Sequence, residues 1–134
     1  MATKQQLLQA VAENQDQLLT LLDRLISFET TSPPARNTIA IQKFIVEQLA
    51  TAGFETKQTP FYQGDELVSG QKAGSDPERY HSLLLNGHVD VATIDRDSWD
   101  TDPFKLTRQG DVLLGRGVSD MKGGMASFLY VFSL

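Results

Sequence analysis

Two polar motifs, each at the end of an apolar segment, most constrain what this chain can fold into. Residues 86–90 read Asn-Gly-His-Val-Asp and follow the short apolar run 82–85. Residues 115–124 read Gly-Arg-Gly-Val-Ser-Asp-Met-Lys-Gly-Gly and lead into an apolar segment with helical spacing. Ligands of layered α/β domains collect beyond the carboxyl ends of strands. The order of helices, then strands, then a helix therefore predicts an α/β fold, a layered sheet flanked by helices, with both motifs at its functional edge.

Apolar spacing predicts three helices. The first is expected to begin near Asn14 or earlier and to end before the prolines at 33–34, which cannot continue a helix. The second is expected between an N-cap at Asn37 and a stop at Gly53, and the third at the end of the chain. Their expected buried faces are, in chain order, Leu18, Leu21, Leu22, Leu25 and Ile26; Ile41, Phe44, Ile45 and Leu49; Met125, Phe128, Leu129 and Phe132.

Strands are predicted between the second and third helices. Residues 54–62 and, more weakly, 66–71 read as strands, followed by a polar loop. The run 82–85 is apolar on both faces, which is typical of a central strand that is covered on both sides. Residues 104–107 and 111–114 are predicted to form a hairpin around a glycine-containing turn.

Composition narrows the classes of function. A chain of 134 residues is the size of one domain, and its net charge of -5 without a basic cluster argues against a nucleic-acid surface. It has no cysteine, so a metal must be held by histidine and carboxylate groups. Neither a signal-peptide core nor a membrane-spanning run of about 20 apolar residues is present in the sequence. We therefore expect a soluble, cytoplasmic protein that binds neither nucleic acid nor membrane.

His88, Asp90 and Asp120 are the residues whose pattern points to metal chemistry. Side chains two apart on an extended strand point the same way, so Asp90 could orient the ring of His88 while the other ring nitrogen binds a metal. The alternative is a purely structural hydrogen bond at a strand end. Asp120 stands in a glycine-bracketed turn, where its carboxylate could bridge two cations. The alternative is an ordinary helix N-cap.

The combination of motifs resembles the co-catalytic zinc amidohydrolases and peptidases, the family of acetylornithine deacetylase, succinyl-diaminopimelate desuccinylase, aminoacylase and glutamate carboxypeptidase. The resemblance extends from the first helix to Leu134 and is most specific in the two motifs, with support from the Trp99 region. It implies that His88 binds one zinc ion and that Asp120 bridges two zinc ions. It also implies that Asp90 is the catalytic residue of this chain, because it orients His88. It also implies a cis peptide bond after Asp120. Cobalt or manganese could replace zinc at such a site.

The resemblance further implies metal-assisted hydrolysis of an amide bond. The substrate would be an N-acyl amino acid, as in acetylornithine deacetylase, or a short peptide, as in the carboxypeptidases and dipeptidases of the family. The general base, the remaining ligands and a second domain, through which a homodimer could form, would all lie beyond Leu134. Residues 1–134 are thus expected to be the N-terminal part of a catalytic domain, with weak metal binding and no useful catalysis alone. The rival hypothesis is a non-catalytic α/β binding module that self-associates through an exposed apolar face of its last helix.

Other polar residues of the second half are assigned structural roles. Arg116 and Lys122 are expected to stabilise the glycine-rich turn and the start of the last helix. Trp99 and Phe104 are expected to be packing residues. The aspartates of residues 95–103 are expected to form a solvated loop, because the pattern of a calcium loop is not met.

Overall fold

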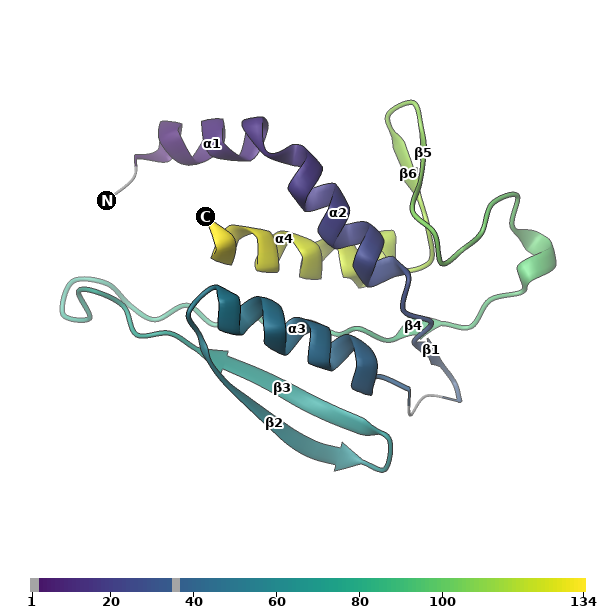
Figure 1. The fold of residues 1–134 in the computed structure, drawn as a ribbon, viewed down its shortest axis with the longest axis horizontal. Helices are drawn as coiled ribbons and strands as arrows, with labels where there is room; N and C mark the ends of the chain where they lie inside the picture. The colour runs from purple at the N-terminus through teal and green to yellow at the C-terminus, as the bar shows by residue number, and fades with distance from the viewer. Residues whose placement is uncertain (1–2, 35–36) are drawn as a thin grey trace.

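A computed structural model describes residues 3–34 and 37–134. Helices and short strands alternate along the chain (Figure 1). The helices are α1 (Lys4–Glu13), α2 (Gln15–Ile26), α3 (Ile39–Thr51) and α4 (Gly123–Ser133). The strands are β1 (Thr31–Ser32), β2 (Glu55–Tyr62), β3 (Asp65–Gln71), β4 (Val91–Ala92), β5 (Thr107–Gln109) and β6 (Val112–Leu114). A 3-10 turn, η1 (Arg96–Ser98), and a π-type turn, η2 (Val118–Lys122), complete the described elements.

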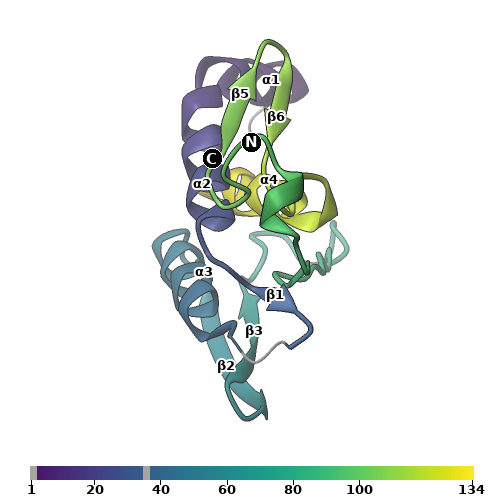
Figure 2. The same ribbon diagram turned by 90° about the vertical axis from the view of Figure 1, so that its right-hand side faces the viewer.

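The strands form separate two-stranded sheets in the described part of the chain. β2 and β3 make an antiparallel hairpin that packs along α3, and β5 and β6 make a second antiparallel hairpin (Figures 1 and 2). β1 and β4 pair in parallel, with Thr31 opposite Val91 and Ser32 opposite Ala92. The predicted α/β class is confirmed, and in the parallel pair β1–β4 the strand β4 follows directly after the first motif.

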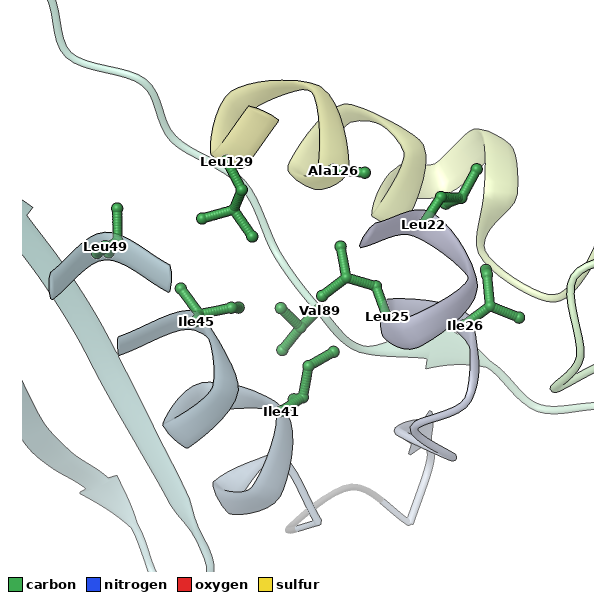
Figure 3. Packing of buried hydrophobic residues seen from close by; sticks show 9 residues of the cluster. All are labelled: Leu22, Leu25, Ile26, Ile41, Ile45, Leu49, Val89, Ala126 and Leu129. Atoms are coloured by element: carbon green, nitrogen blue, oxygen red, sulfur yellow. The ribbon is translucent and has the colours of Figure 1, made fainter. Parts of the chain in front are cut away.

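Three helices enclose the core. The faces that contribute buried side chains belong to α2, α3 and α4 (Figure 3). In Figure 1, α4 lies between the other two. Val89, which is 6% exposed, enters the same cluster from the segment before β4. The cluster comprises Leu22, Leu25, Ile26, Ile41, Ile45, Leu49, Val89, Ala126 and Leu129. The helical faces predicted from apolar spacing are confirmed wherever their residues belong to this cluster.

Local signals set several element boundaries as predicted. α2 begins directly after Asn14, whose side-chain amide donates to the carbonyl of Ala10 at 2.8 Å and ends α1. α3 ends before Gly53, which has the left-handed φ of 81° typical of a helix stop. Gly110 has φ 61° in the turn between β5 and β6. The hairpin therefore has the predicted turn, although its first strand is Thr107–Gln109 and the buried Phe104, expected at its start, lies before it.

Two predictions about this region are wrong. Asn37 does not cap α3: the N-cap is Thr38, and the Asn37 side chain donates to the carbonyl of Glu29 at 3.0 Å. The run 82–85 is not a strand, and Leu83 and Leu84 are 82% and 89% exposed. A central strand needs a hydrogen-bonded neighbour and cover on its faces, and the described residues provide neither at this run.

No helix in the described ranges is long and apolar enough to cross a bilayer.

Candidate metal centre

The first motif stands at the entry to β4. Val91 donates its backbone N–H to the carbonyl of Thr30 at 2.8 Å, which fixes this segment beside β1. Val89 points into the core, and residues on either side of it in an extended segment point the opposite way. His88 and Asp90 consequently share the solvent side, with side chains 46% and 51% exposed. The prediction that these two side chains point the same way is confirmed.

The imidazole of His88 lies between two carboxylates. Its Nδ1 is 3.1 Å from Oδ1 of Asp90, and its Nε2 is 3.1 Å from Oδ1 of Asp120. Nδ1 also lies 3.1 Å from the backbone carbonyl oxygen of Asp90. The fold thus brings together the three residues singled out in the sequence, although Asp120 is 32 positions from His88.

Asp120 owes its position to the irregular turn η2. Gly117 enters this turn with φ 89°, a left-handed value that suits glycine. Asp120 and Met121 then depart from helical dihedrals, and the peptide bond between them is cis, as the resemblance implies. The N-cap position of α4 belongs to Lys122, so the reading of Asp120 as an ordinary N-cap is wrong. Its carboxylate is 86% exposed and faces His88 instead.

The two motif segments are packed directly against each other at two glycines. A Cβ atom on Gly87 would lie 2.5 Å from Sδ of Met125 and 2.9 Å from Cε of Met121. A Cβ atom on Gly117 would lie 2.6 Å from Cγ1 of Val91. The absence of a side chain at these positions lets the segments approach closely enough for His88 and Asp120 to meet.

The donor set fits a divalent cation. A neutral imidazole has one N–H and can donate to only one of the two carboxylates. When Nδ1–H donates to Asp90, the lone pair of Nε2 faces a lone pair on a carboxylate oxygen of Asp120. These two lone pairs repel each other, and a cation bound by both atoms would remove the repulsion. Imidazole and carboxylate are ligands of zinc, cobalt and manganese. No group of three or more histidine or acidic side chains that could hold one metal ion occurs among the residues that the structure describes, so a complete catalytic centre would need further ligands.

Two buried polar side chains bond to the backbone beside the candidate centre, and sequence reasoning gave Thr30 no role there. The hydroxyl of Thr30 donates to the carbonyl of Val89 at 2.5 Å. Nζ of Lys122 donates to the carbonyl of Phe28 at 2.7 Å, and desolvation by burial lowers the pKa of Lys122 from 10.5 to about 8. Lys122 was expected to stabilise the turn, and its Nζ reaches Phe28 in the segment that follows α2. No local pattern signals either contact, because the partners are 59 and 94 positions apart.

Arg116 contacts the segment that follows β4. The Arg116 guanidinium donates to the carbonyl of Thr93 at 3.3 Å and lies 5.5 Å from the ring centroid of Trp99. Phe104 is buried, as expected of a packing residue. Arg96 binds both carboxylate oxygens of Glu29, at 2.9 and 3.0 Å, beside a cavity of about 260 Å³. In the acidic loop, Asp95 and Asp102 accept backbone N–H groups of the loop itself, from Asp97 and Phe104 respectively.

Comparison with known proteins gives consistent results. Residues 84–134, which include both motifs, match peptidase family M20/M25/M40. The chain is 45% identical over 125 residues to N-formyl-4-amino-5-aminomethyl-2-methylpyrimidine deformylase of Bacillus subtilis, covering 92% of this chain and 29% of that protein. It is 31% identical over 110 residues to succinyl-diaminopimelate desuccinylase of Buchnera aphidicola, covering 81% of this chain and 27% of that protein.

A solved structure shares the fold of nearly the whole chain. Human carnosine dipeptidase 1 superposes with a TM-score of 0.82 and 26% identity, over 99% of this chain and 31% of that protein. The chain therefore spans less than a third of the length of each of these relatives. Residues 84–134 therefore belong to peptidase family M20/M25/M40, and the relatives and the fold of the chain agree with that assignment.

Proposed function

We propose that this chain forms one part of a two-metal centre that hydrolyses an amide bond. The observation that carries the proposal is the imidazole of His88 held between the carboxylates of Asp90 and Asp120, each at 3.1 Å and from two separate segments. In this proposal His88 and Asp120 are metal ligands and Asp90 is the orienting residue. Membership of a family that includes amide-bond hydrolases supports it.

Each residue has a defined task. Asp90 accepts the Nδ1–H of His88, which fixes the tautomer and leaves Nε2 free to bind a cation. Asp120 offers two carboxylate oxygens in an exposed position, as a bridging ligand must. When bound, two divalent cations in such a centre polarise the scissile carbonyl and lower the pKa of water to about 7.

The proposal assigns the remaining chemistry to residues outside this sequence. We infer that residues 1–134 are the N-terminal part of a catalytic domain and that the general base and the other ligands come from elsewhere. A catalytic zinc usually needs three protein ligands, so these residues alone should bind metal weakly and should not hydrolyse substrate. Amide hydrolysis by residues 1–134 alone would contradict this assignment.

The substrate that we propose to test first is an N-formyl amine. The sequence resemblance alone pointed to N-acyl amino acids of the acetylornithine type, whereas the relative at 45% identity is named as a deformylase of an aminomethylpyrimidine. The structural similarity to carnosine dipeptidase 1 favours a dipeptide as the second candidate. Both substrates have an amide bond that the same centre would cleave.

The rival proposal of a self-associating binding module loses its main support. It required the apolar face of the last helix to be exposed. Instead Leu129 is 5% exposed, and the ring of Phe132 lies 4.7 Å from that of Phe54. This face is therefore covered to a large extent within the chain.

Metal titration tests the proposal. Zinc or cobalt is titrated into the chain while the imidazole resonances of His88 are followed by NMR, which is practical because the sequence has two histidines. His88→Asn and Asp120→Asn should each weaken binding by at least about tenfold, since even outer partners of metal ligands contribute that much. Asp97→Asn, the same charge change in the acidic loop, is the matched control and should bind as the unmodified chain does. Equal affinity in all of these chains would refute the assignment.

A further inference from the structure

Thr30 and Lys122 are the buried polar side chains in the described part of the chain, at 1% and 0% exposure. Thr30 donates a hydrogen bond to the backbone of the first motif. Lys122 belongs to the second motif and donates to the backbone of Phe28. We propose that they are positioning residues that hold His88 and Asp120 in register through a common anchor, the short segment 28–30 between α2 and β1. This inference rests on the proposed metal centre and adds two residues to it.

Thr30 holds the first motif from both sides of Asp90. Its hydroxyl donates to the carbonyl of Val89 at 2.5 Å, and its own carbonyl accepts the N–H of Val91 at 2.8 Å. The residues bonded are those immediately before and after Asp90. These two bonds define the path of the backbone from which the side chains of His88 and Asp90 project.

Lys122 holds the second motif to the same anchor. Its Nζ donates to the carbonyl of Phe28 at 2.7 Å, and its backbone N–H donates to the carbonyl of Gly117 at 2.8 Å. The carbonyl of Phe28 also accepts the N–H of Thr30, at 3.0 Å. One carbonyl oxygen thus receives a bond from each side, and Asp120 lies two residues before the lysine.

The chemistry of these two residues favours a positioning role over simple packing. Burying a hydroxyl or an ammonium group is unfavourable unless it is hydrogen-bonded, and an apolar side chain of similar size would fill the same space without that penalty. A hydrogen bond adds a direction that apolar packing lacks. Here the hydrogen bonds of Thr30 and Lys122 each hold a stretch of backbone that lies next to a candidate ligand.

A pair of substitutions at Thr30 tests the inference. Thr30→Val keeps the shape of the side chain and removes the donor, whereas Thr30→Ser keeps the hydroxyl. Loss of such an outer contact typically weakens metal binding 10- to 100-fold. In the cobalt titration we therefore expect Thr30→Val and Lys122→Met to bind about tenfold more weakly, with Thr30→Ser close to the unmodified chain.

Tyr130→Phe is the matched control. Tyr130 is 2% exposed and donates its hydroxyl to the carbonyl of Ala10 at 3.3 Å, so its loss also removes one side-chain hydrogen bond to the backbone, away from the motifs. This variant should lower the unfolding midpoint and leave the cobalt affinity unchanged. A merely structural role for Thr30 would give the same result in Thr30→Val, and that result would overturn the inference.

The metal-free chain separates the inference from the proposed function. If the His88 resonances of the unmodified chain do not respond to metal, the metal centre fails. The positioning role is then judged from the ring nitrogen shifts of His88 without metal. They should move in Thr30→Val and Lys122→Met and stay in place in Thr30→Ser and Tyr130→Phe. Unmoved resonances in Thr30→Val would overturn the inference.

Discussion

Substitution of Gly117 by alanine would test how closely the two motif segments approach each other. Gly117 has φ 89°, and a Cβ atom there would lie 2.6 Å from Cγ1 of Val91. Gly110 is the matched control, because it also has a left-handed φ, of 61°, but a Cβ atom there would meet nothing within 4 Å. Both substitutions place an alanine in a left-handed backbone conformation, but only the one at Gly117 brings its Cβ atom against Val91.

The expected losses of stability follow from these two terms. A left-handed backbone costs a non-glycine residue about 1–2 kcal/mol, and an extra methyl group in a packed site costs about 1–3 kcal/mol. Gly110→Ala should therefore lower the free energy of unfolding by about 1–2 kcal/mol, and Gly117→Ala by about 2–5 kcal/mol. The larger value is a major fraction of the stability of a typical domain.

Urea unfolding followed by far-ultraviolet circular dichroism and by the fluorescence of Trp99, the one tryptophan of the sequence, measures both losses. Val91→Ala removes the methyl group that an alanine at 117 would meet, so the double variant should be more stable than the sum of the single losses predicts. Equal losses in Gly117→Ala and Gly110→Ala, or strict additivity with Val91→Ala, would show that the approach is looser than the structure has it.

Three further predictions concern stability. The pKa of Lys122 is lowered from 10.5 to about 8 by burial, so between these values the unfolded chain binds the proton and the folded chain does not. Stability should rise with pH through this window by about 3 kcal/mol, and Lys122→Met should remove that rise in urea unfolding measured at each pH. Leu83 and Leu84 are largely exposed, so replacing both with threonine should change the unfolding free energy by less than about 1 kcal/mol. Leu25→Ala, at a position with 0% exposure, should lower it by about 2–5 kcal/mol.

The helices could be predicted from apolar spacing and from turn residues, because both signals act within a few residues of the chain. Leu22, Leu25 and Ile26 lie on one face of α2, and the left-handed glycine at 53 follows α3, as predicted. Asn37 shows the limit of the same reasoning, since its side chain bonds a carbonyl eight positions away instead of capping the helix. The residue type was suitable for a cap, but a tertiary partner competed for it.

The residues of the candidate site could be predicted from the sequence, but the side chains around them could not. His88, Asp90 and Asp120 could be named because histidine and carboxylate side chains bind metals and because the two motifs together resemble a known family. Thr30 gave no such signal, since a threonine near a helix end is common and its partner lies 59 positions away. The prediction of a strand at residues 82–85 was wrong for a related reason. Its hydrophobicity indicates that it favours burial, but whether it is covered depends on neighbours that local sequence does not specify.

The anchor at residues 28–30 has a consequence for the order of events during synthesis. Phe28 leaves the ribosome early, but its bond partner Lys122 is made 94 residues later. At about 5–20 residues per second, this interval is roughly 5–20 s. His88 is made 32 residues before Asp120, so for roughly 2–6 s the nascent chain holds one half of the candidate centre without the other. The centre can therefore be completed only after the glycine-rich turn has emerged, and any cation that needs both halves must bind after that point.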